Sequence, residues 1–147
     1  MLLSMRRHSG ALVAAGLFLA ACSAWTEPAA SRSSGELVVL SRAEEPSAFM
    51  DALFVGKVSA DSRGCLRLDD PDQHTVIWPR GFDVVQRGAS WVVVDAAGRD
   101  VGTLGGSFRL GGGEVTQVPA DMLSPADAQL AAETCPGRYW LAWIPVF

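Results

Sequence analysis

One histidine stands among several carboxylates in the middle of the chain, and this grouping is the first candidate for chemistry. His74 follows Asp69, Asp70 and Asp72 closely. Imidazole and carboxylates can bind a metal ion or, together with a serine, form a hydrolytic triad. The spacing does not match an EF-hand loop, and the chain has no Gly-x-Ser-x-Gly elbow. We therefore interpret these residues as a solvated turn and predict no metal site, with a hydrolase that uses His74 as an alternative.

A run of three glycines, Gly111 to Gly113, is a second candidate, because glycine-rich loops bind phosphate groups. The lysine and the hydroxyl residue of a phosphate loop are missing, and Glu114 would repel a phosphate. The run therefore predicts a bulge or a hairpin.

The N-terminal residues have the anatomy of a secretory signal. The basic pair Arg6 and Arg7 precedes an apolar run over residues 11–21. This run has about 11 residues, whereas a helix that spans a bilayer needs about 20. The segment therefore predicts export. An uncleaved membrane helix and an ordinary secretory signal remain as alternatives.

Leu19-Ala20-Ala21-Cys22 closes the apolar run and resembles the lipobox of bacterial lipoproteins. The resemblance implies cleavage before Cys22 and attachment of fatty acyl chains such as palmitate to that cysteine. Two or more acyl chains are enough for stable anchoring. The expected location is therefore the cell membrane or the outer membrane, with the protein lipid-anchored and facing the periplasm or the exterior.

The chain then divides into three predicted parts: a signal peptide over residues 1–21, a flexible tether over 22–35 and a β domain over 36–147. The tether is rich in small and polar residues and has no hydrophobic period. Loss of Arg6 and Arg7 with the signal takes the formal charge from −4 to −6. This acidic balance argues against nucleic acid as a partner.

Two further cysteines, Cys65 and Cys135, remain in the predicted domain. An even pair in an exported chain predicts a disulfide. Two free buried thiols are the alternative. Zinc binding is not expected, because the pair lacks the Cys-x-x-Cys spacing of zinc clusters.

Short β-branched and aromatic runs alternate with turn residues from residue 36 to residue 118. A turn signal every 8–12 residues or so is typical of an all-β sandwich or a small antiparallel barrel. The candidate strands are residues 36–40, 54–58, 65–68, 75–78, 82–85, 91–94, 101–104, 107–110, 114–118 and 139–144.

One short helix is predicted near the C-terminus, over residues 126–133. Ser124 is a suitable N-cap, Pro125 suits the first helical position, and Asp127 completes the spacing of a capping box. Pro136 follows at once and ends the helix.

Four aromatic residues are candidates for a ligand surface: Trp78, Tyr139, Trp140 and Trp143. Aromatic side chains more often fill a core. Alternation along residues 139–144 nevertheless places them on both faces of one strand, so one face is either exposed or covered by the helix. An exposed aromatic face would mark a binding surface, for example for glycans.

Several local motifs resemble those of a group of small uncharacterised lipoproteins from GC-rich bacteria. They are Gly64-Cys65-Leu66, Trp78-Pro79-x-Gly81-Phe82, Gly111-Gly112-Gly113-Glu114 and Cys135-Pro136-Gly137-x-Tyr139-Trp140. The resemblance implies that both cysteines belong to one compact domain, and it implies no activity.

The sequence as a whole predicts a lipid-anchored protein of the cell envelope with a non-enzymatic binding or structural role. No catalytic residues and no cofactor are expected, and the partners would be the membrane and an unidentified envelope ligand or protein. An envelope hydrolase and a glycan-binding module are the alternatives.

Overall fold

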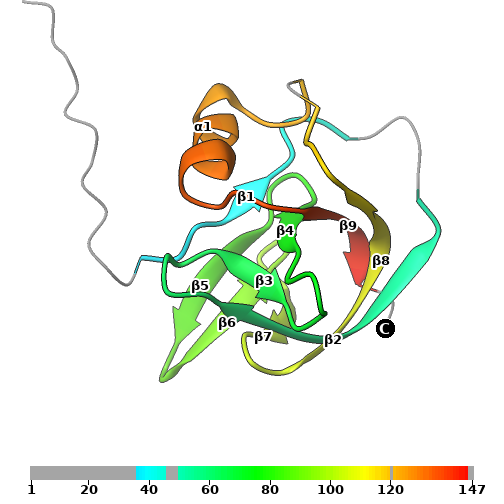
Figure 1. Cartoon of the computed structure of the whole chain (residues 1–147). Helices are drawn as coiled ribbons and strands as arrows, with labels where there is room; N and C mark the ends of the chain where they lie inside the picture. The colour runs from blue at the N-terminus through cyan, green and yellow to red at the C-terminus, as the bar shows by residue number, and fades with distance from the viewer. Residues whose placement is uncertain (1–35, 46–49, 120, 146–147) are drawn as a thin grey trace, which may run out of the picture. The chain divides into compact units, whose positions relative to one another are not determined.

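The structure is a computed structural model that describes residues 36–45, 50–119 and 121–145 (Figure 1). The predicted signal peptide, the tether and Cys22 lie outside the described residues. The elements are β1 (Leu40–Ser41), β2 (Ala52–Ala60), β3 (Leu66–Leu68), β4 (Thr75–Trp78), β5 (Asp83–Arg87), β6 (Ser90–Val94), β7 (Asp100–Thr103), β8 (Ser107–Val115), α1 (Pro125–Glu133) and β9 (Tyr139–Pro145).

Strands β4, β3, β2, β8 and β9 pair in that order, and β9 pairs with β4 again to close a barrel. The pairs β4–β3, β3–β2, β2–β8 and β8–β9 are antiparallel, whereas the closing pair β4–β9 is parallel. The short β1 adds to β4 in parallel. The structure therefore confirms the all-β class and the small barrel with one short helix near the C-terminus.

The closing strands β4 and β9 are buried on both faces. From one face Val76 and Trp140 join the cluster that fills the barrel, because inward side chains alternate with outward ones. From the other face Ile77 and Leu141 join a second cluster, which contains the disulfide and Ala131 of α1. This double burial explains the aromatic and apolar sequence of the last strand.

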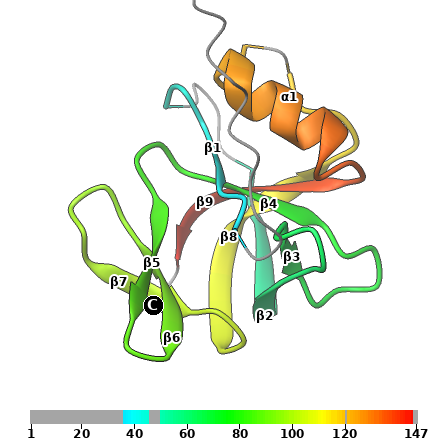
Figure 2. The ribbon, with the colours of Figure 1, turned by 90° about the vertical axis from the view of Figure 1, so that its left-hand side faces the viewer.

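Strands β5, β6 and β7 form a separate antiparallel sheet. Val93 of β6 is fully buried, and it packs into the barrel cluster with Phe108. Figures 1 and 2 show this sheet and α1 on different sides of the barrel strands. The barrel is thus covered by two different layers.

Helix α1 begins as its sequence predicts. The Ser124 side chain accepts a hydrogen bond from the Asp127 amide at 3.1 Å, and Pro125 occupies the first turn. Among the described residues, no helix has the length and apolarity needed to cross a membrane.

The glycine run departs from the prediction of two separate strands. β8 continues through Gly111, Gly112 and Gly113, although its register with β9 shifts between Leu110 and Gly112, which is the expected bulge. A Cβ atom at Gly112 would collide with the Leu141 carbonyl oxygen. Glycine is therefore required here by the close approach of β9.

Candidate functional site

A cleft of about 530 Å³ opens between the loop after β4, the turn between β6 and β7, and the end of β9. Its walls combine aromatic, aliphatic and charged side chains, a mixture typical of small-molecule sites. The lining residues are Glu45, Pro79, Arg80, Phe82, Asp95, Ala96, Ala97, Arg99, Asp100, Val101 and Trp143.

The turn on one wall of the cleft is built around Asp95. Its carboxylate accepts hydrogen bonds from the amides of Ala97 and Arg99, both at 2.9 Å, and from the Arg99 side chain at 2.7 Å. The hydrogen bond from the Arg99 side chain and those from the backbone hold the pKa of Asp95 below its ordinary value. The turn therefore keeps a fixed shape beside the cleft.

The opposite wall approaches this turn at Gly81. Gly81 has a φ of +78°, and a Cβ atom there would lie 2.8 Å from the Cβ of Ala96. Glycine thus serves both the turn conformation and the close approach of the two loops. The Phe82 amide donates to the Pro79 carbonyl at 3.2 Å and completes this tight turn.

Two aromatic rings on the cleft wall are supported from behind. The Phe82 ring stacks on Trp78 with an interplanar angle of 12°. The Trp143 ring carries the guanidinium of Arg42, whose central carbon lies 4.3 Å from the ring centroid. Both rings are therefore held in place, and a ligand that packs on the partly exposed Phe82 ring costs that ring little entropy.

Arg42 is buried, with 3 % of its surface exposed, directly behind the cleft wall. One terminal nitrogen donates to the Ala142 carbonyl, but Nε and the other terminal nitrogen have no hydrogen-bond partner in the described part of the chain. Burial lowers the pKa of Arg42, and the charge of Glu45 opposes this shift. Glu45 itself lines the cleft, so a carboxylate of the cleft wall interacts electrostatically with this buried cation.

His74 lies elsewhere, between the loop before β4 and β8, and its contacts overturn the interpretation of a solvated turn. The residue is 4 % exposed. Its Nδ1 pairs with the Asp70 carboxylate, while Nε2 lies 3.5 Å from Glu114 without the alignment of a hydrogen bond. Arg138 holds the Glu114 carboxylate at 2.6 Å. The ring is therefore fixed between two carboxylates.

The prediction that four aromatic residues form an exposed ligand surface is wrong. Trp78, Tyr139, Trp140 and Trp143 are all buried. The reason is that β4 and β9 pack against the barrel interior on one face and against the α1 side on the other. Of the four, only Trp143 also lines the 530 Å³ cleft.

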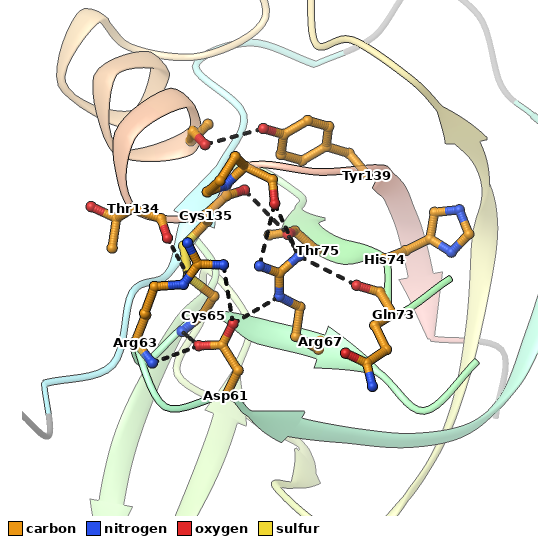
Figure 3. A network of polar contacts seen from close by, with 12 residues as sticks. Asp61, Arg63, Cys65, Arg67, Gln73, His74, Thr75, Thr134, Cys135 and Tyr139 are labelled. Carbon is orange, nitrogen blue, oxygen red and sulfur yellow. Dashed lines mark hydrogen bonds and ion pairs between the residues drawn. A yellow bond between two sulfur atoms is a disulfide. The ribbon is translucent and has the colours of Figure 1, made fainter. Parts of the chain in front are cut away.

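The disulfide between Cys65 and Cys135 is present, with the two Cα atoms 5.7 Å apart (Figure 3). It ties the residue before β3 to the end of α1, across a sequence separation of 70. Both half-cystines are fully buried in the second core cluster. The predicted disulfide is therefore confirmed, and the alternative of two free buried thiols is excluded.

Beside the disulfide, Asp61 and Arg67 organise a network of hydrogen bonds that Figure 3 shows from close by. Asp61 accepts from the amides of Arg63 and Cys65 and from Arg67 Nε at 2.8–3.0 Å. Arg67 also donates to the Thr75 hydroxyl at 2.6 Å. Burial disfavours the Asp61 carboxylate, but these bonds outweigh it and hold its pKa below the ordinary value.

A second cavity, of about 340 Å³, lies against the inner side of α1. Tyr139 lines it and donates its hydroxyl hydrogen bond to the Ala131 carbonyl at 3.1 Å. Burial raises the pKa of this phenol. Because this cavity is lined by neutral side chains and backbone, it offers no charged group that would orient a ligand.

No group of three metal-binding side chains occurs among residues 36–45, 50–119 and 121–145. No protein-family model, no curated protein and no solved structure matches the chain.

Sequence reasoning missed most of the cleft. Its residues come from a polar break, two turns and the last strand, and none of these segments carries a motif with known chemistry. Pro79, Gly81 and Phe82 belong to the motif Trp78-Pro79-x-Gly81-Phe82, but the resemblance that it carries implies no activity. A weak signal in the sequence is that each of the two turns carries an arginine, Arg80 and Arg99, and both arginines line the cleft.

Proposed function

We propose that this chain is a lipid-anchored protein of the cell envelope whose folded part binds a small ligand and performs no catalysis. The observation that carries the binding role is the cleft of about 530 Å³, whose size and mixed lining suit a small molecule. The anchor rests on the lipobox pattern at Cys22.

The ligand class that fits the cleft best is a glycan. Sugar rings have apolar faces and polar edges, and the cleft offers the partly exposed Phe82 as an apolar surface, with the largely buried Trp143 also in its lining. Arg80 and Asp100 stand at the same cleft as charged hydrogen-bonding groups. Both carboxylates and guanidinium groups are present, which suits the many donors and acceptors of a neutral or zwitterionic glycan.

The alternative of a hydrolase using His74 has less support. A general base must reach the proton it abstracts, but the His74 ring is buried and both its nitrogens face carboxylates. Neither of the two cavities described above is lined by His74.

A titration tests the binding role. The full chain, purified in detergent with its disulfide intact, is titrated with soluble cell-wall glycan fragments while tryptophan fluorescence is recorded, because Trp143 borders the cleft. Arg80→Ala should weaken binding about tenfold, which corresponds to ~1.4 kcal/mol.

The matched control is Arg63→Ala, since Arg63 is another exposed arginine and lies in the disulfide region. This variant should bind like the unchanged chain. A fluorescence signal that is absent for every fragment tested, or equal losses in both variants, would contradict the glycan proposal. Release of a hydrolysis product that His74→Ala abolishes would favour the enzyme instead.

A further inference from the structure

Two exposed apolar side chains lie next to each other on the outer face of the barrel, and neither lines the cleft. Among the described residues, the large hydrophobic side chains that are exposed are those of Met50, Leu53, Val55 and Trp91. Leu53 and Val55 are the most exposed of these, at 50 % and 58 %, and they lie on the same strand, β2. Two such side chains at alternate positions point to the same side of a sheet.

The orientation of this pair follows from the barrel interior. Phe54 packs against the inner cluster and Val58 is part of it. Alternation then turns Leu53 and Val55 outward, away from the interior. The alternation along β2 therefore places both side chains at the surface and not in the core.

Two cations accompany the apolar pair. Lys57 follows two residues after Val55 on the same side of β2, and Arg109 of β8 is the register partner of Val55. Both are exposed, and neither takes part in an ion pair between described residues. We call Leu53, Val55, Lys57 and Arg109 the β2–β8 face.

Carboxylates are kept off the centre of this face. Ser107 and Gly111 are the register partners of Lys57 and Leu53. The same alternation reaches a carboxylate only at Asp51, before the strand begins. Asp69 accepts a hydrogen bond from the backbone amide of Lys57, not from its ammonium group. The centre of the face therefore carries two cations, in a chain with a formal charge of −4, while Asp51 and Asp69 lie at its margins.

We infer that the β2–β8 face docks on the surface of an anionic lipid bilayer. Apolar side chains that enter the headgroup region, flanked by basic side chains that meet anionic lipids, are the combination used by peripheral membrane proteins. The charge complementarity favours lipid over a nucleic acid, because the face has two cations and no aromatic stacking surface.

The docking adds to the proposed lipid anchor but does not depend on it. A random coil as long as the predicted tether, residues 22–35, has a root-mean-square span of about 20 Å. A span of this length would keep the domain close to the bilayer and raise the effective concentration of the face. The face then orients the domain against the membrane.

The test uses Lys57, the single lysine of the chain. The full chain is reconstituted into vesicles of phosphatidylcholine alone, or of phosphatidylcholine with phosphatidylglycerol, and treated with an amine-reactive ester. Mass spectrometry of peptides gives the acylation rate at Lys57. Docking should slow this rate about fivefold on the anionic vesicles, as expected when about four-fifths of the molecules are docked.

The double variant Leu53→Ser, Val55→Ser separates docking from a simple effect of surface charge on the amine, because it leaves both cations in place. Its acylation rate should be equal in the two kinds of vesicle. The matched control is Trp91→Ser, which removes an exposed apolar side chain from the other sheet and should keep the slowing.

Flotation of the chain with vesicles reports the anchor separately. A chain that floats with both vesicle types but shows equal acylation rates is anchored, and the docking proposal is overturned. A chain that floats only with anionic vesicles, and loses this in the double variant, lacks the anchor but supports docking. Protection of Lys57 in native membranes that anionic vesicles do not reproduce would assign the face to a protein partner and overturn the proposal.

Discussion

The two ends of β4 have contrasting polar surroundings, and each end has a buried or half-buried arginine. At the first residue, Thr75, Arg67 donates to a hydroxyl and to the Asp61 carboxylate. At the last residue, Trp78, the Arg42 amide donates to the strand carbonyl at 3.0 Å, but two nitrogens of its guanidinium have no hydrogen-bond partner among the described residues.

The difference separates a structural region from a candidate functional one. Around Arg67 the polar groups satisfy one another beside a disulfide, so this region stabilises the fold. Around Arg42 a cation is left with incomplete hydrogen bonding next to a cleft, and natural proteins concentrate such exceptions at functional sites. The stability of the domain should therefore depend far more on the first end of β4 than on the second.

The largest effect is expected from the disulfide. Replacing both Cys65 and Cys135 by serine should lower the free energy of unfolding by about 4 kcal/mol in the chain-entropy model for a loop of this length. Urea denaturation of the purified chain measures this change. The control is Cys22→Ser, which should leave the midpoint unchanged; equal losses in both would contradict the structural role of the bond.

The two arginines provide a matched pair for the next effect. Arg67→Met should destabilise the domain by about 2–3 kcal/mol, because it leaves the half-buried Asp61 carboxylate and the Thr75 hydroxyl with fewer partners. The same denaturation experiment applies. A loss below that of the Arg42 variant would reverse the assignment of the two regions.

Arg42→Met should change the stability by about 1 kcal/mol or less. The loss of the stacking on Trp143 is offset by removal of a buried cation that is incompletely hydrogen-bonded. Glycan binding should weaken at the same time, because the charge behind the cleft wall is gone. A variant that loses several kcal/mol but binds normally would make Arg42 a structural residue.

The smallest expected effect is a pH dependence of the unfolding free energy, which arises from Asp61 beside Arg67. The folded-state pKa of Asp61 lies below its ordinary value of 3.8, so its contribution to stability is fully present above about pH 4 and is lost as the pH falls through the folded pKa. Asp61→Asn should flatten the fall of the unfolding free energy below pH 4. An unchanged slope would show that other carboxylates dominate.

Local signals in the sequence were sufficient for much of the fold. The cap at Ser124 defined the start of α1, and the β-branched run of residues 75–78 matches β4. The expected strand over 36–40 shrank to β1 at Leu40–Ser41, because the extent of a strand depends on the partner it finds, here the second half of β4. Barrel closure through a parallel pair also depends on distant contacts that no local pattern encodes.

The candidate site was far less predictable. Aromatic content drew attention to Tyr139 and Trp140, yet these residues serve the two core clusters. The cleft arises where two turns meet, and its contributors Glu45 and Arg80 look like ordinary polar loop residues. Such a site forms only when segments distant in the chain fold together, so the spacing of residues in the sequence does not predict it.

The most direct test of this contrast is amide hydrogen exchange of the full chain with and without saturating cell-wall glycan fragments. Binding in the cleft predicts slower exchange in residues 79–82 and 95–101, while residues 61–67 around the disulfide network keep their rates. Slower exchange confined to residues 61–67, or equal rates throughout in the presence of bound glycan, would contradict the assignment of the cleft as the binding site.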